Sequence, residues 1–156
     1  MSPATPAESI ARLRGTELDL VALLSGTDTA SLRRRPDDGE WSALQILTHL
    51  ADAEMVYGVR VRLILTVERP WISAYDQDSW ADRFVELEQD AKDTVHRWRI
   101  LRDANLRVFA SLQPADWERS GMHAERGEES VALIAEHLAD HDRAHLAQLR
   151  RALAAI

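Results

Sequence analysis

The chain has 156 residues, of which 46% are hydrophobic and 29% are charged, and its formal net charge is −7; these values are typical of one globular domain with a substantial core. The acidic balance and the lack of a sustained basic patch argue against nucleic acid as a partner, because phosphate binding needs a positive field. No apolar run is long enough for a membrane helix, and because the chain has no cysteine any metal must be held by nitrogen and oxygen.

Apolar residues recur at helical spacing along most of the chain. The first helix is expected over residues 6–25, with an inward face made of Ile10, Leu13, Leu20, Val21 and Leu24. A loop rich in aspartate, glycine and proline follows over about 26–40. The second helix is expected to begin at Ser42, a favourable N-cap residue, and to end near Val67.

Two further helices are predicted in the second half of the chain. Residues 71–80 are expected to form a loop with aromatic anchors, and the third helix covers roughly 81–112, with a break near its start. A connection over 115–130 then leads into the fourth helix, which ends near residue 152. Four long helices without strand alternation predict an all-α domain over residues 1–156, a four-helix bundle, in which facing helices build ligand and metal sites. The start, MSPATPAES, lacks a signal-peptide pattern, so the cytoplasm is the expected location.

Half of the six histidines stand four residues apart in the fourth predicted helix: His137, His141 and His145. Residues at this spacing lie one above the other on a helix, which suits two ligands of one metal ion. At about 100° per residue, the apolar stripe through Ile134 and Leu138 passes through His141 and His145, whereas His137 falls at its edge. Two histidines in a buried stripe need partners, because an unpaired polar ring is costly to bury.

His49 offers a match on the second predicted helix. It shares an apolar face with Leu50 and Tyr57, so a bundle can bring it against His141 and His145. Three histidine nitrogens with an open fourth position form a catalytic type of site for a divalent metal. The alternative is that His49 is a satisfied core histidine and that the two histidines of the fourth helix bind nothing.

The other histidines and two tryptophans have several interpretations. His137 is expected at the rim of the site or behind a ligand, although as a fourth ligand it would close the site. His96 is expected on the surface, and His123 lies in a connection that could overhang the site. Trp41 and Trp117 are expected to wall the core near the helix starts or to floor a pocket.

Acidic residues near the histidines also have two interpretations. Glu54 could orient a ligand from behind or pair with an arginine, for which Arg60 and Arg62 are candidates. Asp140 and Asp142 are expected to point to other faces, where they would be solvated or paired within their own helix.

Two segments, EWSALQILTHLADAE (40–54) and LQPADWERSGMHAERGEESVALIAEHLADHDRAHLAQL (112–149), resemble the DinB/YfiT-like superfamily. The shared features are a Trp-Ser pair that opens a helix, a histidine in the text that follows it, and a closing His-Asp-x-x-His-Leu-x-Gln-Leu. The resemblance covers roughly residues 40–150. It implies a four-helix bundle with a divalent metal, zinc or nickel, held by three histidines that map onto His49, His141 and His145.

The resemblance implies less about the reaction. Characterised members include bacillithiol-dependent S-transferases and a mycothiol-dependent maleylpyruvate isomerase, whereas others are named metal-dependent hydrolases. In the transferases the metal lowers the pKa of a small thiol, and the thiolate attacks an electrophile. We therefore expect a small-thiol-dependent S-transferase. The alternatives are a hydrolase that uses metal-bound water and a non-catalytic metal-binding stress protein.

The expected partners are a small-molecule substrate, with a low-molecular-weight thiol as a candidate, and a second copy of the chain in a homodimer. The homodimer is implied mainly by the resemblance. Trp71, Tyr75 and Trp80 lie outside the core stripes, so they could line such an interface or cap the bundle's own end.

Overall fold

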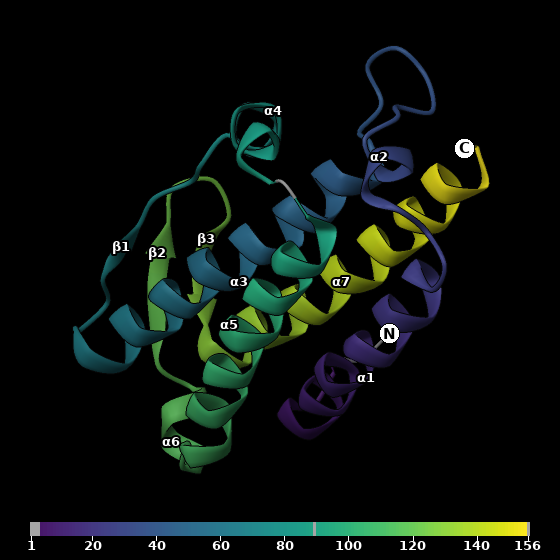
Figure 1. Cartoon of the computed structure of the whole chain (residues 1–156). Coiled ribbons are helices and arrows are strands. Elements are labelled where there is room, and N and C mark those ends of the chain that lie inside the picture. The colour runs from purple at the N-terminus through teal and green to yellow at the C-terminus, as the bar shows by residue number, and fades with distance from the viewer. Residues whose placement is uncertain (1–3, 89, 156) are drawn as a thin grey trace.

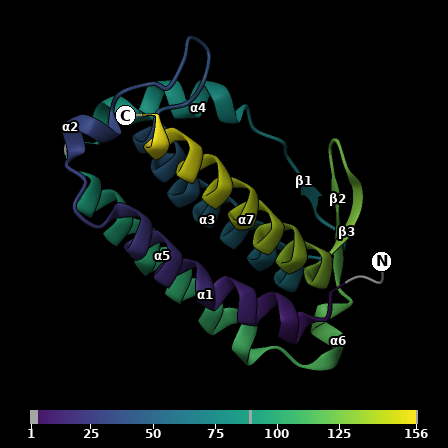
Figure 2. The same cartoon turned by 90° about the vertical axis from the view of Figure 1, so that its right-hand side faces the viewer.

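Four long helices form the body of the protein (Figure 1), in a computed structural model that describes residues 4–88 and 90–155. They are α1 (Pro6–Leu24), α3 (Ala43–Thr66), α5 (Ala91–Ser111) and α7 (Val131–Ala154). Helix α7 packs against α1 and α3, and α5 packs against α3 and lies alongside α1 (Figure 2). The predicted four-helix bundle is confirmed. Among the described residues, no helix combines the length and the apolar character needed to cross a membrane.

Side-chain caps fix where the long helices begin. The Ser42 hydroxyl accepts a hydrogen bond from the Gln45 amide, and the Gln45 side chain accepts one from the Ser42 amide, which makes a capping box at the start of α3. The Ser130 hydroxyl is the N-cap of α7 and accepts a hydrogen bond from the Leu133 amide. Both helices therefore start where the sequence predicts them.

The third predicted helix is broken near its start, as expected, and the break divides it into two helices. Helix α4 (Gln77–Phe84) is followed by a 3₁₀ turn (Val85–Leu87), and α5 begins only at residue 91. Asp76 and Asp90 cap α4 and α5, each by accepting a backbone hydrogen bond from the first turn. One further helical turn, α2 (Thr29–Leu32), lies in the expected loop over 26–40.

A small sheet stands where the sequence predicts only loops. Strand β1 (Trp71–Ile72) pairs in parallel with β2 (Ser120–His123), which pairs antiparallel with β3 (Gly127–Ser130). Gly127 has a φ of 80° at the turn between β2 and β3, a conformation that favours glycine. A short helix, α6 (Pro114–Trp117), precedes the hairpin. Strands of two to four residues are too short for an alternating pattern, so the expectation of a connection without strands is wrong here.

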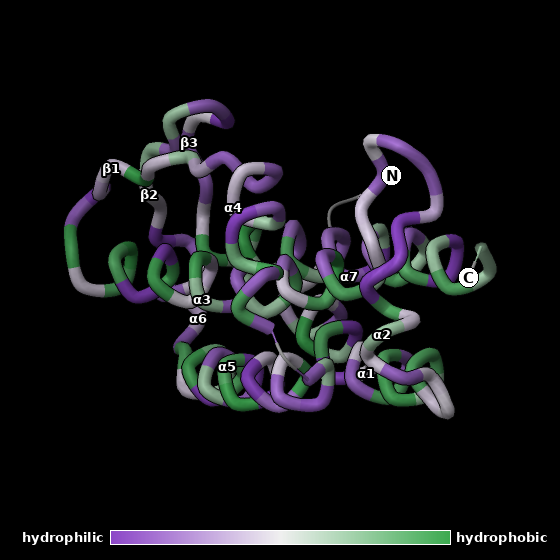
Figure 3. The backbone as a smooth tube through the Cα atoms, turned by 45° about the horizontal axis from the view of Figure 1, so that its top comes forward, coloured by the Kyte–Doolittle hydropathy of each residue, from purple (hydrophilic) through white to green (hydrophobic). Residues whose placement is uncertain are grey.

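The core has two apolar clusters. Along the long helices, hydrophobic segments alternate with hydrophilic ones (Figure 3). One cluster includes Leu47, Leu146 and Leu149, and the other includes Ala53 and Leu138. The stretch of α7 that holds His141 and His145 lies between its contributions to the two clusters. This placement puts the two histidines at the level where the two clusters meet.

Helix α1 buries a narrower face than predicted. Its buried positions are Ser9, Leu13, Thr16 and Leu20, a helical spacing that suits its packing on α7. Val21 is 52% exposed, so its predicted inward position is wrong. It lies one residue beyond Leu20 and therefore about 100° round the helix.

The three aromatic residues outside the core stripes lie in different surroundings. Tyr75 and Trp80 pack on each other with ring centroids 4.7 Å apart, and Trp80 also packs on Phe84. These contacts favour the interpretation that they cover the protein's own end. Trp71 is exposed. The homodimer stays a prediction.

Candidate metal centre

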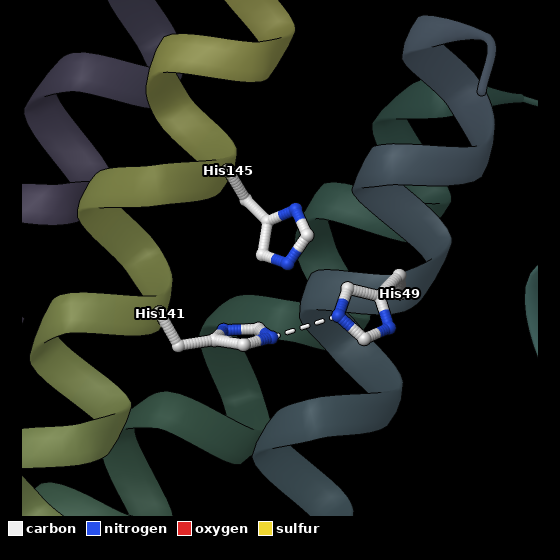
Figure 4. A group of neighbouring side chains, drawn as sticks. All are labelled: His49, His141 and His145. Carbon is white, nitrogen blue, oxygen red and sulfur yellow. Dashed lines mark hydrogen bonds between the residues drawn. The ribbon is translucent and has the colours of Figure 1, made fainter. Parts of the chain in front are cut away.

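Three histidines converge between α3 and α7 (Figure 4). One ring nitrogen from each of His49, His141 and His145 lies within 4.8 Å of the others, and the Nε2 atoms of His49 and His141 are 2.7 Å apart. The structure therefore brings together the three histidines that the sequence selects. A tetrahedral zinc ion lies about 2.0–2.1 Å from each ligand, which places ligand nitrogens roughly 3.4 Å apart. The observed separations bracket that value, so the donor set fits a divalent cation.

Helix geometry places these rings. His49 is fully buried on the face of α3 that meets α7, whereas His141 and His145 are half-buried one turn apart on α7. Burial lowers the pKa of His49 to about 2, and its two histidine neighbours add to that effect. Burial also lowers the pKa of His145 to about 4, with His141 adding to the effect and the hydrogen bond to Gln148 opposing it. Both rings are neutral at physiological pH, as metal ligation requires.

Two residues outside the triad orient His145. The Gln148 side-chain oxygen lies 2.8 Å from His145 Nδ1, so an Nδ1–H donates to the amide and leaves the Nε2 lone pair available for a cation. The Trp41 ring stacks on His145 at 6.0 Å with planes 7° apart, and its edge meets His49 at 5.0 Å. Sequence analysis missed Gln148, although its position one turn after His145 was a usable signal.

His141 is backed by a buried carboxylate. Its Nδ1 lies 4.0 Å from Asp142 Oδ1, and neither of these buried atoms has a hydrogen-bond partner among the described residues. The other Asp142 oxygen accepts hydrogen bonds from Thr16 on α1 and Arg102 on α5, each at 2.7 Å. The expectation that Asp142 is solvated or paired within its helix is therefore wrong. Asp140 does pair within the helix with Arg143, and it also pairs with α1.

Glu54 belongs to the same buried network. It accepts hydrogen bonds from Arg102 Nε at 2.9 Å and from Asn105 at 2.8 Å. Glu54 therefore pairs with an arginine, as one of the two interpretations expects, but that arginine is Arg102, and the candidates Arg60 and Arg62 are wrong. Burial raises the pKa of Glu54, and the Arg102 guanidinium opposes that rise. One guanidinium thus joins two buried carboxylates from α3 and α7 directly behind the histidines. The partners are too far apart in the chain for spacing alone to pair them.

The remaining histidines lie outside the cluster. His137 Nδ1 is 2.9 Å from a Glu129 oxygen, and its side chain is partly exposed at the edge of α7, which matches the expected rim position. His96 is exposed on α5, as expected. His123, at the end of β2, is buried and lines a cavity together with His141.

Two cavities reach the candidate metal centre. The larger, of about 340 Å³, is lined by Trp41, His145 and Gln148 among others. The smaller, of about 170 Å³, is lined by His141 and by residues of α3 and the sheet. Gln77, the first residue of α4, lines both. Small molecules can therefore approach the histidines from two sides. Trp117, in contrast, lines neither cavity: it stacks on Phe109 and packs against the second apolar cluster, as the core interpretation expects.

The fold and the site define a four-helix bundle with a three-histidine candidate metal centre. A family model described as the DinB superfamily matches residues 12–149, and the chain belongs to this superfamily. The family resemblance predicted from the sequence is therefore confirmed.

Proteins with similar sequences are named as candidate metal-dependent hydrolases. A protein of Oceanobacillus iheyensis, named as a candidate metal-dependent hydrolase, is 33% identical over 118 residues, which cover 71% of this chain and 64% of that protein. A Bacillus mycoides protein with the same kind of name is 31% identical over 117 residues, again 71% of this chain and 64% of its own length. The chain thus spans just under two thirds of the length of these relatives.

Two solved structures share the fold. YfiT from Bacillus subtilis, described as a candidate metal-dependent hydrolase with an unusual four-helix bundle topology, has a TM-score of 0.79 and 23% identity, covering 97% of this chain and 89% of that chain. The four-helix bundle protein TT2238 has a TM-score of 0.69 and 22% identity, covering 94% of this chain and 99% of that chain. At such identities these likenesses show the fold alone.

Proposed function

We propose that the protein is a metal-dependent enzyme whose divalent cation, zinc or nickel, is held by His49, His141 and His145. The observation that carries this proposal is the convergence of three ring nitrogens within 4.8 Å on facing helices. Imidazole suits zinc and nickel, and three protein ligands leave a position open for a substrate. The contact between His137 and Glu129 supports a site with an open fourth position. His137 is the histidine that would close the site as a fourth ligand, and its ring contacts Glu129 instead.

The proposed chemistry is activation of a nucleophile. A divalent cation in such a site lowers the pKa of a coordinated thiol or water. The protein's own residues prepare the site for it: burial keeps His49 and His145 neutral, Gln148 fixes the orientation of His145, and Trp41 covers one face of that ring.

We favour a small-thiol-dependent S-transferase as the reaction. The two cavities that reach the histidines support it, because a transfer between two small molecules needs a place for each. The chain has no cysteine, so the thiol must come from outside. Hydrolysis is the second candidate, and the hydrolase names of the relatives favour it.

Cobalt substitution tests the thiol proposal. A thiolate bound to cobalt absorbs strongly in the near ultraviolet, and no thiol of this chain can produce that band. We expect the cobalt-loaded protein to gain the band saturably on titration with bacillithiol, mycothiol or glutathione. His141→Ala should abolish the band, whereas His96→Ala, at an exposed position on α5, should keep it. A flat spectrum with all three thiols would eliminate the transferase proposal and leave hydrolysis.

A further inference from the structure

The smaller of the two cavities, of about 170 Å³, has a lining that the metal centre does not explain. We call it the arginine cavity; its lining includes Tyr57, Arg60, Tyr75, His123, Arg126 and His141. Of these residues only His141 belongs to the candidate ligand set. The others come from α3, the segment before α4, and the β2–β3 hairpin, so the sheet that the sequence did not predict builds one wall.

Arg60 is a buried cation without a direct ion-pair partner among the described residues. It is 4% exposed, and no carboxylate among the described residues lies within ion-pair distance of it. One terminal nitrogen donates to the Ser73 carbonyl at 3.1 Å, and the guanidinium lies over the Tyr57 ring at 5.2 Å. Its Nε is buried and has no hydrogen-bond partner in the part of the chain that the structure describes. An uncompensated guanidinium is costly to bury, so this arrangement favours a bound anion.

His123 supplies a second unsatisfied donor in the same cavity. It is 2% exposed, and its Nδ1 accepts hydrogen bonds from the backbone amides of Glu125 and Arg126, at 3.2 and 3.4 Å. Because Nδ1 accepts, the ring hydrogen is on Nε2. That Nε2 is buried and has no hydrogen-bond partner within residues 4–88 and 90–155. Apart from His141 Nδ1, which lies on the side of Asp142, the cavity residues thus carry two unsatisfied groups among the described residues, and both are donors. A ligand that satisfies them must present acceptors.

The charges around the cavity favour a singly charged anion. Arg126 forms a two-point ion pair with the buried Glu129, with distances of 2.7 and 2.9 Å, so its charge is already balanced. The exposed Glu125 also lines the cavity and adds negative charge. Of the two arginines that line the cavity, Arg60 is the one that forms no direct ion pair with the described residues. A carboxylate matches one guanidinium in charge and in planar geometry, whereas a doubly charged phosphate would meet these acidic neighbours.

We propose that the arginine cavity binds the carboxylate of a small-molecule substrate, with Arg60 Nε and His123 Nε2 as donors. This inference rests on the proposed function, because the cavity adjoins His141 and a molecule anchored there would extend towards the metal centre. The Tyr57 ring lines the cavity together with His141, and the centroids of the two rings are 6.1 Å apart.

Calorimetry on metal-free protein tests the anion site separately from the metal centre. We expect propionate to bind saturably in a low-chloride buffer, and neutral propionamide of similar shape not to bind. Arg60→Gln should weaken propionate binding by at least about tenfold, since a hydrogen bond to a charged group contributes about that much. Arg107→Gln removes an exposed arginine of α5 and should leave the affinity unchanged.

A spectroscopic readout covers the case in which Arg60→Gln fails to fold. In the ¹⁵N-labelled wild-type protein, propionate should shift the Nε2 resonance of His123 and leave that of the exposed His96 unmoved. Absence of binding, or equal losses in Arg60→Gln and Arg107→Gln, would overturn the inference, and equal affinity for inorganic phosphate would contradict the carboxylate assignment. Cobalt loading of the same sample separates the two proposals. If the protein binds cobalt but not propionate, only the carboxylate inference fails. If it binds propionate but not cobalt, the proposed function fails.

Discussion

Replacing His49, His141 or His145 by alanine is expected to weaken zinc binding by more than about 100-fold. Loss of a group that merely supports a ligand costs 10–100-fold in metal affinity, and each of these rings supplies one of the three converging nitrogens. His137→Ala is the matched control on the same helix. It should change the affinity by less than about tenfold, because its ring contacts Glu129 instead of the cluster. Competition with a chromophoric chelator measures all four variants.

A variant at Gln148 tests whether the support of His145 matters for metal affinity. Gln148→Leu removes the acceptor for His145 Nδ1 and should fall between the two groups, at about 10–100-fold. Comparable losses in His137→Ala and His141→Ala would show that the ligand set is drawn wrongly. Loss of affinity in Gln148→Leu as large as that in His145→Ala would show that Gln148 does more than orient the ring.

Replacing Arg102 by methionine is expected to lower the free energy of unfolding by about 3–5 kcal/mol. The change leaves Glu54 and Asp142 buried without their shared cation, so two uncompensated carboxylates lie in the core. Urea denaturation of the metal-free protein measures the loss. Arg99→Met is the control on the same helix: it breaks an ion pair with Glu17 that is half-exposed, and should cost less than about 1 kcal/mol.

A double variant tests the reason given for the loss. Adding Glu54→Gln to Arg102→Met removes one of the two buried charges, so part of the lost stability should return. Equal costs for Arg102→Met and Arg99→Met would contradict a stabilising role for the buried network. A double variant less stable than Arg102→Met would contradict the charge argument.

The helices were predictable because local chemistry determines them. Ser42 and Ser130 cap α3 and α7 as expected, since the side chain that accepts the first-turn amides is adjacent in sequence. The first helix and its buried Leu13 and Leu20 also follow from periodicity. Val21 shows the limit of that argument, because the width of a buried face depends on which helix packs against it.

The sheet was not predictable in the same way. Strand β1 has two residues, and its partner β2 lies some fifty residues later in the chain. Neither the alternation nor the turn pattern of so short a strand stands out from a loop. The consequence for the site is direct, because this sheet places His123 at the edge of the arginine cavity.

The convergence of the three candidate ligands could be predicted from the sequence, whereas the residues that surround them could not. The positions of His49, His141 and His145 follow from the angles of two amphipathic helices, which is local information. The buried network behind them joins Glu54 on α3 with Arg102 on α5 and Asp142 on α7. Such a network depends on three-dimensional packing, so the sequence indicated the wrong arginines for Glu54 and did not predict that Asp142 is buried against Arg102.

Elemental analysis of protein prepared without an affinity tag tests the central claim most directly. The convergence of three histidine nitrogens between α3 and α7 predicts close to one divalent metal ion per chain. It also predicts that chelator-treated protein takes up one equivalent of zinc or nickel again. Protein that is purified without metal and then refuses zinc, nickel and manganese would contradict the account.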